Sequence, residues 1–160
     1  MLSATSGIGQ NNAMPNGEAL ITIYSNHMTL LGGTLGHQWG AFKGRFFDGE
    51  KQLAFIEPAH FVTFRIPVGE HIFTAGSWMS KNSKKGAHTK VTIEGGHRYF
   101  IECGSFAGAP AFGIREVTCH SAQPVGMGLK PLEAAHLRAA GRLLVIPESS
   151  FPDCSIANSP

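Results

Sequence analysis

Short apolar stretches separated by turn residues recur through the middle of the chain. Residues 61–66 alternate, so Val62, Phe64 and Ile66 share one face of a strand while Thr63 and Arg65 share the other. Similar stretches follow at intervals of about 8–12 residues, a spacing typical of an antiparallel sandwich or barrel. The pattern predicts strands at residues 19–24, 42–47, 52–56, 61–66, 71–75, 90–94, 98–103 and 115–119.

Turn residues lie between these strands at the positions that hairpins require. Asp48-Gly49 is a strong two-residue hairpin signal, and Pro67-Val68-Gly69 and Gly95-Gly96 mark two further tight turns. Glycines also gather at residues 31–44, where we expect bulges or bends, and in the Gly/Ala/Pro loop 104–113.

The C-terminal part changes to a helical period. Within residues 131–144, Leu132, Ala135, Ala139 and Leu143 fall on one face, and Pro131 suits a first helical turn. The predicted fold is therefore mainly β, an antiparallel β-sandwich of seven to eight strands with one C-terminal α-helix. We expect a flexible leader at 1–17, the sandwich at 18–121, a linker and a helix packed on it at 122–147, and a frayed tail at 148–160.

Composition limits the class of protein. Glycine contributes 20 of the 160 residues while charged residues make up only 15%, which excludes a disordered chain and a coiled coil. No apolar run is long enough for a transmembrane helix, and Met1 to Asn12 lacks the features of a signal peptide. Charged side chains protect sheet edges from pairing with another chain, and this chain has few of them. We therefore expect a protein partner or a homo-oligomer.

Four of the 13 Lys and Arg residues form the one basic cluster in the sequence: Lys81, Lys84, Lys85 and Lys90. They lie in a Ser/Asn/Gly-rich stretch, which indicates a solvated loop tip, with contact to a phosphate or another anionic surface as the alternative. Because the net charge is only +2, we expect no nucleic-acid partner.

Two carboxylates are the candidates for acid–base chemistry. If the last hairpin closes near residue 109, Glu102 lies opposite Glu116, where one carboxylate raises the pKa of the other. The simpler interpretation is an exposed pair relieved by Arg98 and Arg115. The alternative is a ligand site or a hydrolase site between the sheets, formed by Glu102, Glu116 and Arg115.

The cysteines and histidines show no metal-binding spacing, and no metal or cofactor is expected. The same register separates Cys103 from Cys119 by about 13 Å, too far for a disulfide. We therefore expect buried free thiols, although Cys154 on the tail can reach either one or a second chain. Trp39, Trp78 and the other aromatic residues are interpreted mostly as core.

The turn motifs resemble a bacterial family known as a domain of unknown function, numbered twenty-eight forty-six, similar in style to PEGA-type and transthyretin-like modules. The matching segments are residues 21–24 (ITIY), 48–49 (DG), 67–71 (PVGEH), 91–100 (VTIEGGHRYF) and the alanine-rich 133–142. The resemblance covers roughly residues 18–145. It implies a small β-sandwich, no catalytic residues, and a place in the periplasm or cell envelope.

These observations favour a non-enzymatic structural or interaction module that self-associates or binds a protein through a sheet edge or the glycine-rich segment 31–44. Two alternatives remain open. One is a small-ligand binder or hydrolase with a pocket between the sheets, and the other is a filament or shell subunit.

Overall fold

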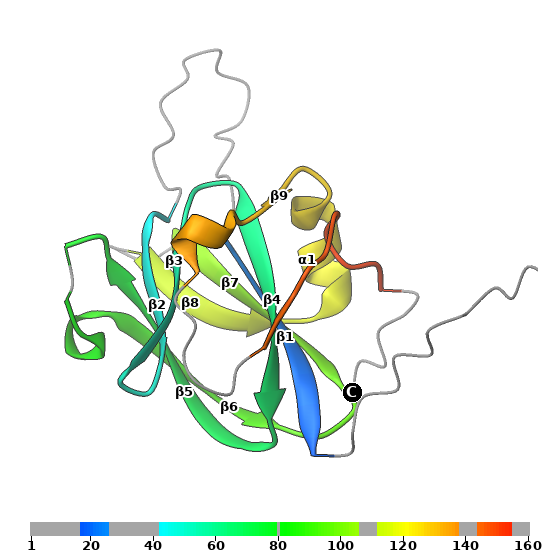
Figure 1. Cartoon of the computed structure of the whole chain (residues 1–160), viewed down its shortest axis with the longest axis horizontal. Helices are drawn as coiled ribbons and strands as arrows, with labels where there is room; N and C mark the ends of the chain where they lie inside the picture. Colours follow the sequence, from blue (N-terminus) through cyan, green and yellow to red (C-terminus); the bar gives the residue numbers. More distant parts are fainter. Residues whose placement is uncertain (1–16, 26–41, 80, 106–111, 138–143, 155–160) are drawn as a thin grey trace, which may run out of the picture.

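The computed structural model describes residues 17–25, 42–79, 81–105, 112–137 and 144–154, and these form a mainly β structure with two sheets (Figure 1). The elements in chain order are β1 (Glu18–Ser25), β2 (Gly44–Asp48), β3 (Lys51–Ile56), β4 (His60–Pro67), β5 (Gly69–Ser77), the 3-10 turn η1 (Ser83–Lys85), β6 (Ala87–Ile93), β7 (Arg98–Ser105), β8 (Phe112–Val117), α1 (Cys119–Gly126), β9 (Lys130–Pro131), the 3-10 turn η2 (Ala134–His136) and β10 (Leu144–Ile146).

The first sheet has the strand order β10-β4-β1-β7-β8, and the two-residue β9 pairs with the start of β4. β1 runs antiparallel to β4 but parallel to β7, so the sheet is mixed rather than purely antiparallel as predicted. β7 and β8 form an antiparallel pair at one edge.

The second sheet has the strand order β3-β2-β5-β6, and all of its pairs are antiparallel. The predicted hairpin at Asp48-Gly49 is confirmed, and Gly49 takes a positive φ of 58° that suits glycine. The neighbouring strand is tied to this hairpin by His71, whose Nδ1 lies 2.8 Å from a carboxylate oxygen of Asp48.

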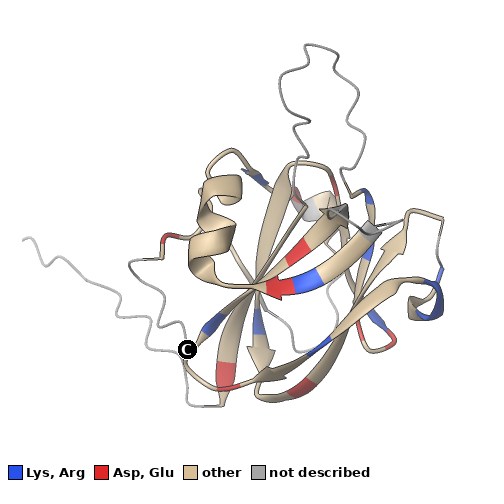
Figure 2. Ribbon diagram, turned by 180° about the vertical axis from the view of Figure 1, so that it is seen from behind, with Lys and Arg blue, Asp and Glu red and all other residues tan. Residues whose placement is uncertain are grey.

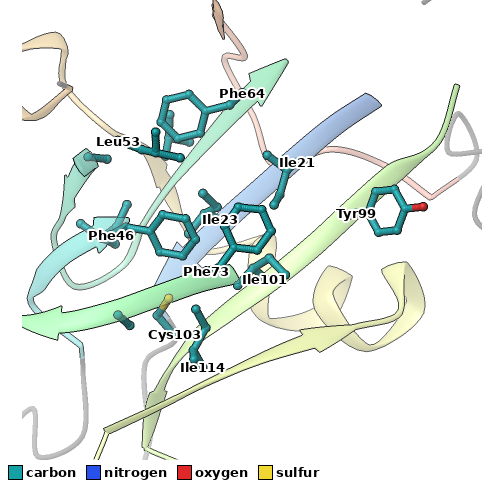
Figure 3. Packing of buried hydrophobic residues seen from close by; sticks show 14 of the residues in the cluster. Ile21, Ile23, Phe46, Leu53, Phe64, Phe73, Tyr99, Ile101, Cys103 and Ile114 are labelled. Carbon is teal, nitrogen blue, oxygen red and sulfur yellow. The ribbon is translucent and has the colours of Figure 1, made fainter. Parts of the chain in front are cut away.

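The inward side chains of both sheets meet in one hydrophobic cluster (Figure 3). Alternation along β1 sends Ile21 and Ile23 into it, and Phe46 and Phe73 from the second sheet stack with ring centroids 5.5 Å apart. Cys103 is fully buried among these side chains as a free thiol.

The opposite face of the first sheet carries a second apolar cluster. Tyr24, Phe61 and Phe100 point away from the main core, and the ring of Phe151 lies 5.4 to 5.8 Å from each of theirs. Helix α1 covers the same cluster, so this part of the outer face is buried as well. The prediction of a frayed tail is therefore wrong as far as residue 154.

The helix expected at 131–144 is wrong. Pro131 belongs to β9, η2 is a single short turn, and β10 begins at Leu144, while residues 138–143 lie outside the described part of the chain. The N–H groups of Lys130 and Leu132 donate to the carbonyls of Ala59, just before β4, and of Phe61, within β4, so this segment satisfies its backbone by pairing with the sheet.

The observed helix is α1, which begins at Cys119, the last residue of the strand predicted at 115–119. Thr118 is its N-cap, and its hydroxyl accepts a hydrogen bond from the Ser121 N–H. The described residues contain ten strands rather than seven to eight, because β9 and β10 are two short additions at the edge of β4. The other predicted strands are confirmed within a few residues. The leader and most of the glycine-rich segment lie outside the described residues.

Candidate functional site

The predicted pairing of two carboxylates across the last hairpin is wrong by one residue. Glu102 lies opposite Arg115, and Glu116 lies opposite Ile101. Because neighbouring residues of a strand point to opposite faces, this shift places the carboxylates on different sides of the sheet. They do not form an acid–base pair.

Glu102 is held in an ion pair instead. It is only 4% exposed, and its Oε2 accepts from Nε (2.8 Å) and Nη2 (2.7 Å) of Arg115. Burial and the nearby Glu102 charge raise the pKa of the Tyr24 hydroxyl and of the Cys103 thiol well above their usual range. These two groups therefore stay protonated at neutral pH and are poor nucleophiles.

Glu116 lines a surface cavity of about 240 Å³ at the start of β7 and the end of β8. Arg98, Tyr99 and Thr118 are among the other lining residues. Desolvation by partial burial raises the pKa of the Glu116 carboxyl. Of the three predicted ligand-site residues, only Glu116 belongs to this cavity, whose lining residues come from β7, the end of β8 and the start of α1.

A chain of hydrogen bonds that the sequence analysis missed crosses the outer face of the first sheet. Arg98 donates to the hydroxyl of Thr22, which lies 2.9 Å from that of Thr63, and Thr63 donates to Glu148. Arg98 also pairs directly with Glu148, with Nη2 and Oε1 2.8 Å apart. The side chains of Arg98, Thr22, Thr63 and Glu148 all bond to one another in this row. The row of hydrogen bonds therefore fastens the segment after β10 to the sheet.

A disulfide joins Cys119 and Cys154, with Cα atoms 5.6 Å apart, so the expectation of buried free thiols holds for Cys103 alone. The alternative, in which Cys154 reaches one of the other two cysteines, is confirmed. The exclusion of a Cys103–Cys119 bridge is confirmed. The bridge joins the start of α1 to the end of the segment that carries Phe151, and a hydrogen bond from Gln123 to Asp153 lies beside it. The spacing of three cysteines gave no sign of which two would meet.

Three of the four clustered lysines gather at the end of the β5–β6 hairpin. Lys81, Lys84 and Lys85 are exposed there, and Asn82 caps η1 by accepting from the Lys84 N–H at 3.2 Å. Lys90 does not join them, because it lies along β6 and pairs with Glu70 at 2.7 Å.

Two large apolar side chains lie beside these lysines. Trp78 is 60% exposed and Met79 is 68% exposed, so the interpretation of Trp78 as core is wrong. We call the group formed by Trp78, Met79, Lys81, Lys84 and Lys85 the tryptophan–lysine tip, and Figure 2 shows its basic turn at one end of the molecule. The position of Trp78, between a strand and a lysine-rich turn, was the available sequence signal.

Metal-binding clusters and membrane-spanning helices were also sought in the part of the chain that the structure describes. Within those residues, no three His, Cys, Asp or Glu side chains come together in a way that could hold a metal ion. Among the described helices, none has the length and apolar character needed to cross a membrane.

No protein-family model, curated protein or solved structure matches the chain. The resemblance to the numbered domain family therefore stays a prediction.

Proposed function

We propose that the chain is a non-enzymatic interaction module of the bacterial cell envelope, that its two sheets form a β-sandwich, and that it contacts its partner through the tryptophan–lysine tip. The observation that carries the proposal is the tip itself. Trp78 and Met79 are two of the most exposed large apolar residues among those described, and they are adjacent in the chain. Neighbouring exposed apolar side chains with a charged rim are typical of interaction sites.

Two observations support the architecture and the compartment. The inward faces of both sheets contribute to one cluster, as expected of two sheets packed face to face. The Cys119–Cys154 bridge is the kind of bond that persists in the periplasm or outside the cell and is rare in the cytosol.

The sheet edges are a weaker contact surface than the sequence suggested. Along one side, β9 and β10 cover β4, and Leu137 bridges to Ala54 of β3. Along the other side, β6 and β8 lie next to each other across the two sheets. Short strands and mutual cover are common ways in which proteins protect such edges.

A small-ligand site remains the second candidate because of the cavity that Glu116 and Arg98 line. A partly buried carboxyl with a raised pKa in a small cavity suits a small polar ligand. A thermal-shift screen with the Glu116→Gln variant as control tests this candidate, since stabilisation by a specific ligand has to weaken in the variant.

Site-specific photo-crosslinking tests the proposed function. A benzophenone amino acid replaces Trp78 in the full chain, expressed in cells that naturally produce it, and the matched control places the same group at Val68. Val68 is 45% exposed and lies just before β5, whereas Trp78 lies just after it. We expect position 78 to give a discrete adduct, with a protein or with a smaller molecule such as a lipid, that position 68 does not give. The absence of adducts at 78, or the same adducts at both positions, contradicts the proposal.

A further inference from the structure

The tryptophan–lysine tip combines an interfacial aromatic residue with unpaired positive charge. We infer that it binds the surface of a membrane containing anionic phospholipids, an inference that rests on the proposed function because it names the partner of the same contact surface.

The charge at the tip is uncompensated. Residues 71–93 contain four lysines and no Asp or Glu. None of Lys81, Lys84 and Lys85 forms an ion pair with a described residue, whereas two other exposed lysines do. Those ion pairs are Lys43–Glu57 (3.8 Å) and Lys90–Glu70 (2.7 Å). The three tip lysines are therefore available for an external anion.

The apolar side chains favour a lipid surface over a soluble anion. Tryptophan is enriched at membrane–water interfaces because its ring is apolar and its indole N–H is polar. Met79 adds a flexible apolar side chain beside Trp78, and both are mostly exposed. Free phosphate uses neither group, so their position next to the lysines is explained by a surface that is both anionic and apolar.

The basic residues of the tip also favour lipid over nucleic acid. All three are lysines, which act as mobile point charges, whereas arginine is the usual residue for fixed two-pronged contacts to phosphate. Single-stranded nucleic acid is bound by aromatic platforms along a basic groove, and the tip offers one ring at the end of a hairpin.

All five residues of the tip belong to the connection between β5 and β6. The tip follows the last residue of β5 and precedes β6, so it lies at one end of its sheet (Figure 1). Each lysine near an anionic membrane contributes about 1 kcal/mol, which is roughly a fivefold change in binding. Removing all three is expected to weaken binding roughly a hundredfold, and removing the indole ring about tenfold.

Vesicle flotation of the full, oxidised chain tests the inference. The probes are vesicles of phosphatidylcholine alone and of phosphatidylcholine mixed with phosphatidylglycerol. We expect the chain to float only with the mixed vesicles and to be released by high salt. The variant K81Q/K84Q/K85Q is expected to lose binding roughly a hundredfold, and Trp78→Ala about tenfold.

A second triple variant, K51Q/K90Q/K130Q, removes the same net charge from exposed positions elsewhere, and we expect it to float as the parent does. Equal loss in both triple variants overturns the inference, because binding then follows net charge and not the tip. Competition by millimolar inorganic phosphate, or binding of an oligonucleotide without any binding of vesicles, overturns it as well. A protein adduct at position 78 without vesicle binding leaves the proposed function standing and removes only the lipid inference.

Discussion

Reduction of the Cys119–Cys154 disulfide is expected to destabilise the fold strongly. The bridge closes a loop with a sequence separation of 35 residues. In the chain-entropy treatment, a loop of that length lowers the free energy of the folded state relative to the unfolded state by about 4 kcal/mol. For a chain of this size, losing about 4 kcal/mol of stability on reduction lowers the melting temperature by roughly 10 °C.

The structure gives a further reason for a large effect. The bridge anchors the segment that places Phe151 against Tyr24, Phe61 and Phe100, so reduction also loosens an aromatic cluster. The pairing of Arg98 with Glu148 holds only the near end of this segment. We therefore expect the near-ultraviolet circular dichroism of the aromatic residues to weaken before the strands unfold.

The assay is urea unfolding of the oxidised and the reduced chain, with thiols counted under denaturant. The oxidised chain is expected to expose one titratable thiol, that of Cys103, and the reduced chain three. Cys103→Ala is the matched control, because it prevents thiol exchange while leaving the bridge intact. Three thiols in the oxidised chain, or equal unfolding midpoints with and without reductant in this variant, refute the reasoning.

Three smaller changes test the packing and electrostatics. Gly126→Ala places a Cβ only 2.0 to 2.3 Å from three ring carbons of Phe151 and is expected to cost about 2 kcal/mol in urea unfolding, whereas Gly128→Ala meets nothing within 4 Å and is expected to be nearly neutral; equal costs contradict the packing. Arg115→Met removes the guanidinium that pairs with the buried Glu102 carboxylate and is expected to cost about 1–2 kcal/mol, less than for a fully buried pair because the arginine is 55% exposed; a double-mutant cycle with Glu102→Gln that shows no coupling argues against the ion pair. Burial raises the pKa of Glu116, so its charged form opposes folding and stability falls as pH rises through the carboxyl range; Glu116→Gln is expected to be more stable than the parent at pH 7 but not near pH 3, and an equal gain at both contradicts this assignment.

The strands were predictable because their side-chain pattern follows directly from burial on one face. Val62, Phe64 and Ile66 alternate with Thr63 and Arg65 in the sequence, and β4 sends the first three into the main core. The register of β7 and β8 was not predictable, since it depends on where their connection turns. A register shifted by one residue pairs Glu102 with Glu116, whereas the observed register pairs Glu102 with Arg115.

The C-terminal region was mispredicted because local propensity is weaker than tertiary pairing. The stretch around Leu132 has a helical period, but its backbone bonds to the edge of β4, and β10 extends the same edge. The disulfide and Phe151 depend on the path of this segment, which no local pattern encodes. Trp78 shows the opposite error, since hydrophobicity alone does not say that a residue at a hairpin end is exposed.

The fluorescence of Trp78 tests the central claim most directly, namely that the tryptophan–lysine tip is the contact surface. The chain has two tryptophans, so Trp39→Phe leaves Trp78 as the only one. With vesicles containing phosphatidylglycerol brominated near the headgroup, the account predicts a blue shift of the emission and quenching by the bromines. Vesicle binding with unchanged emission would place the contact elsewhere and contradict the account.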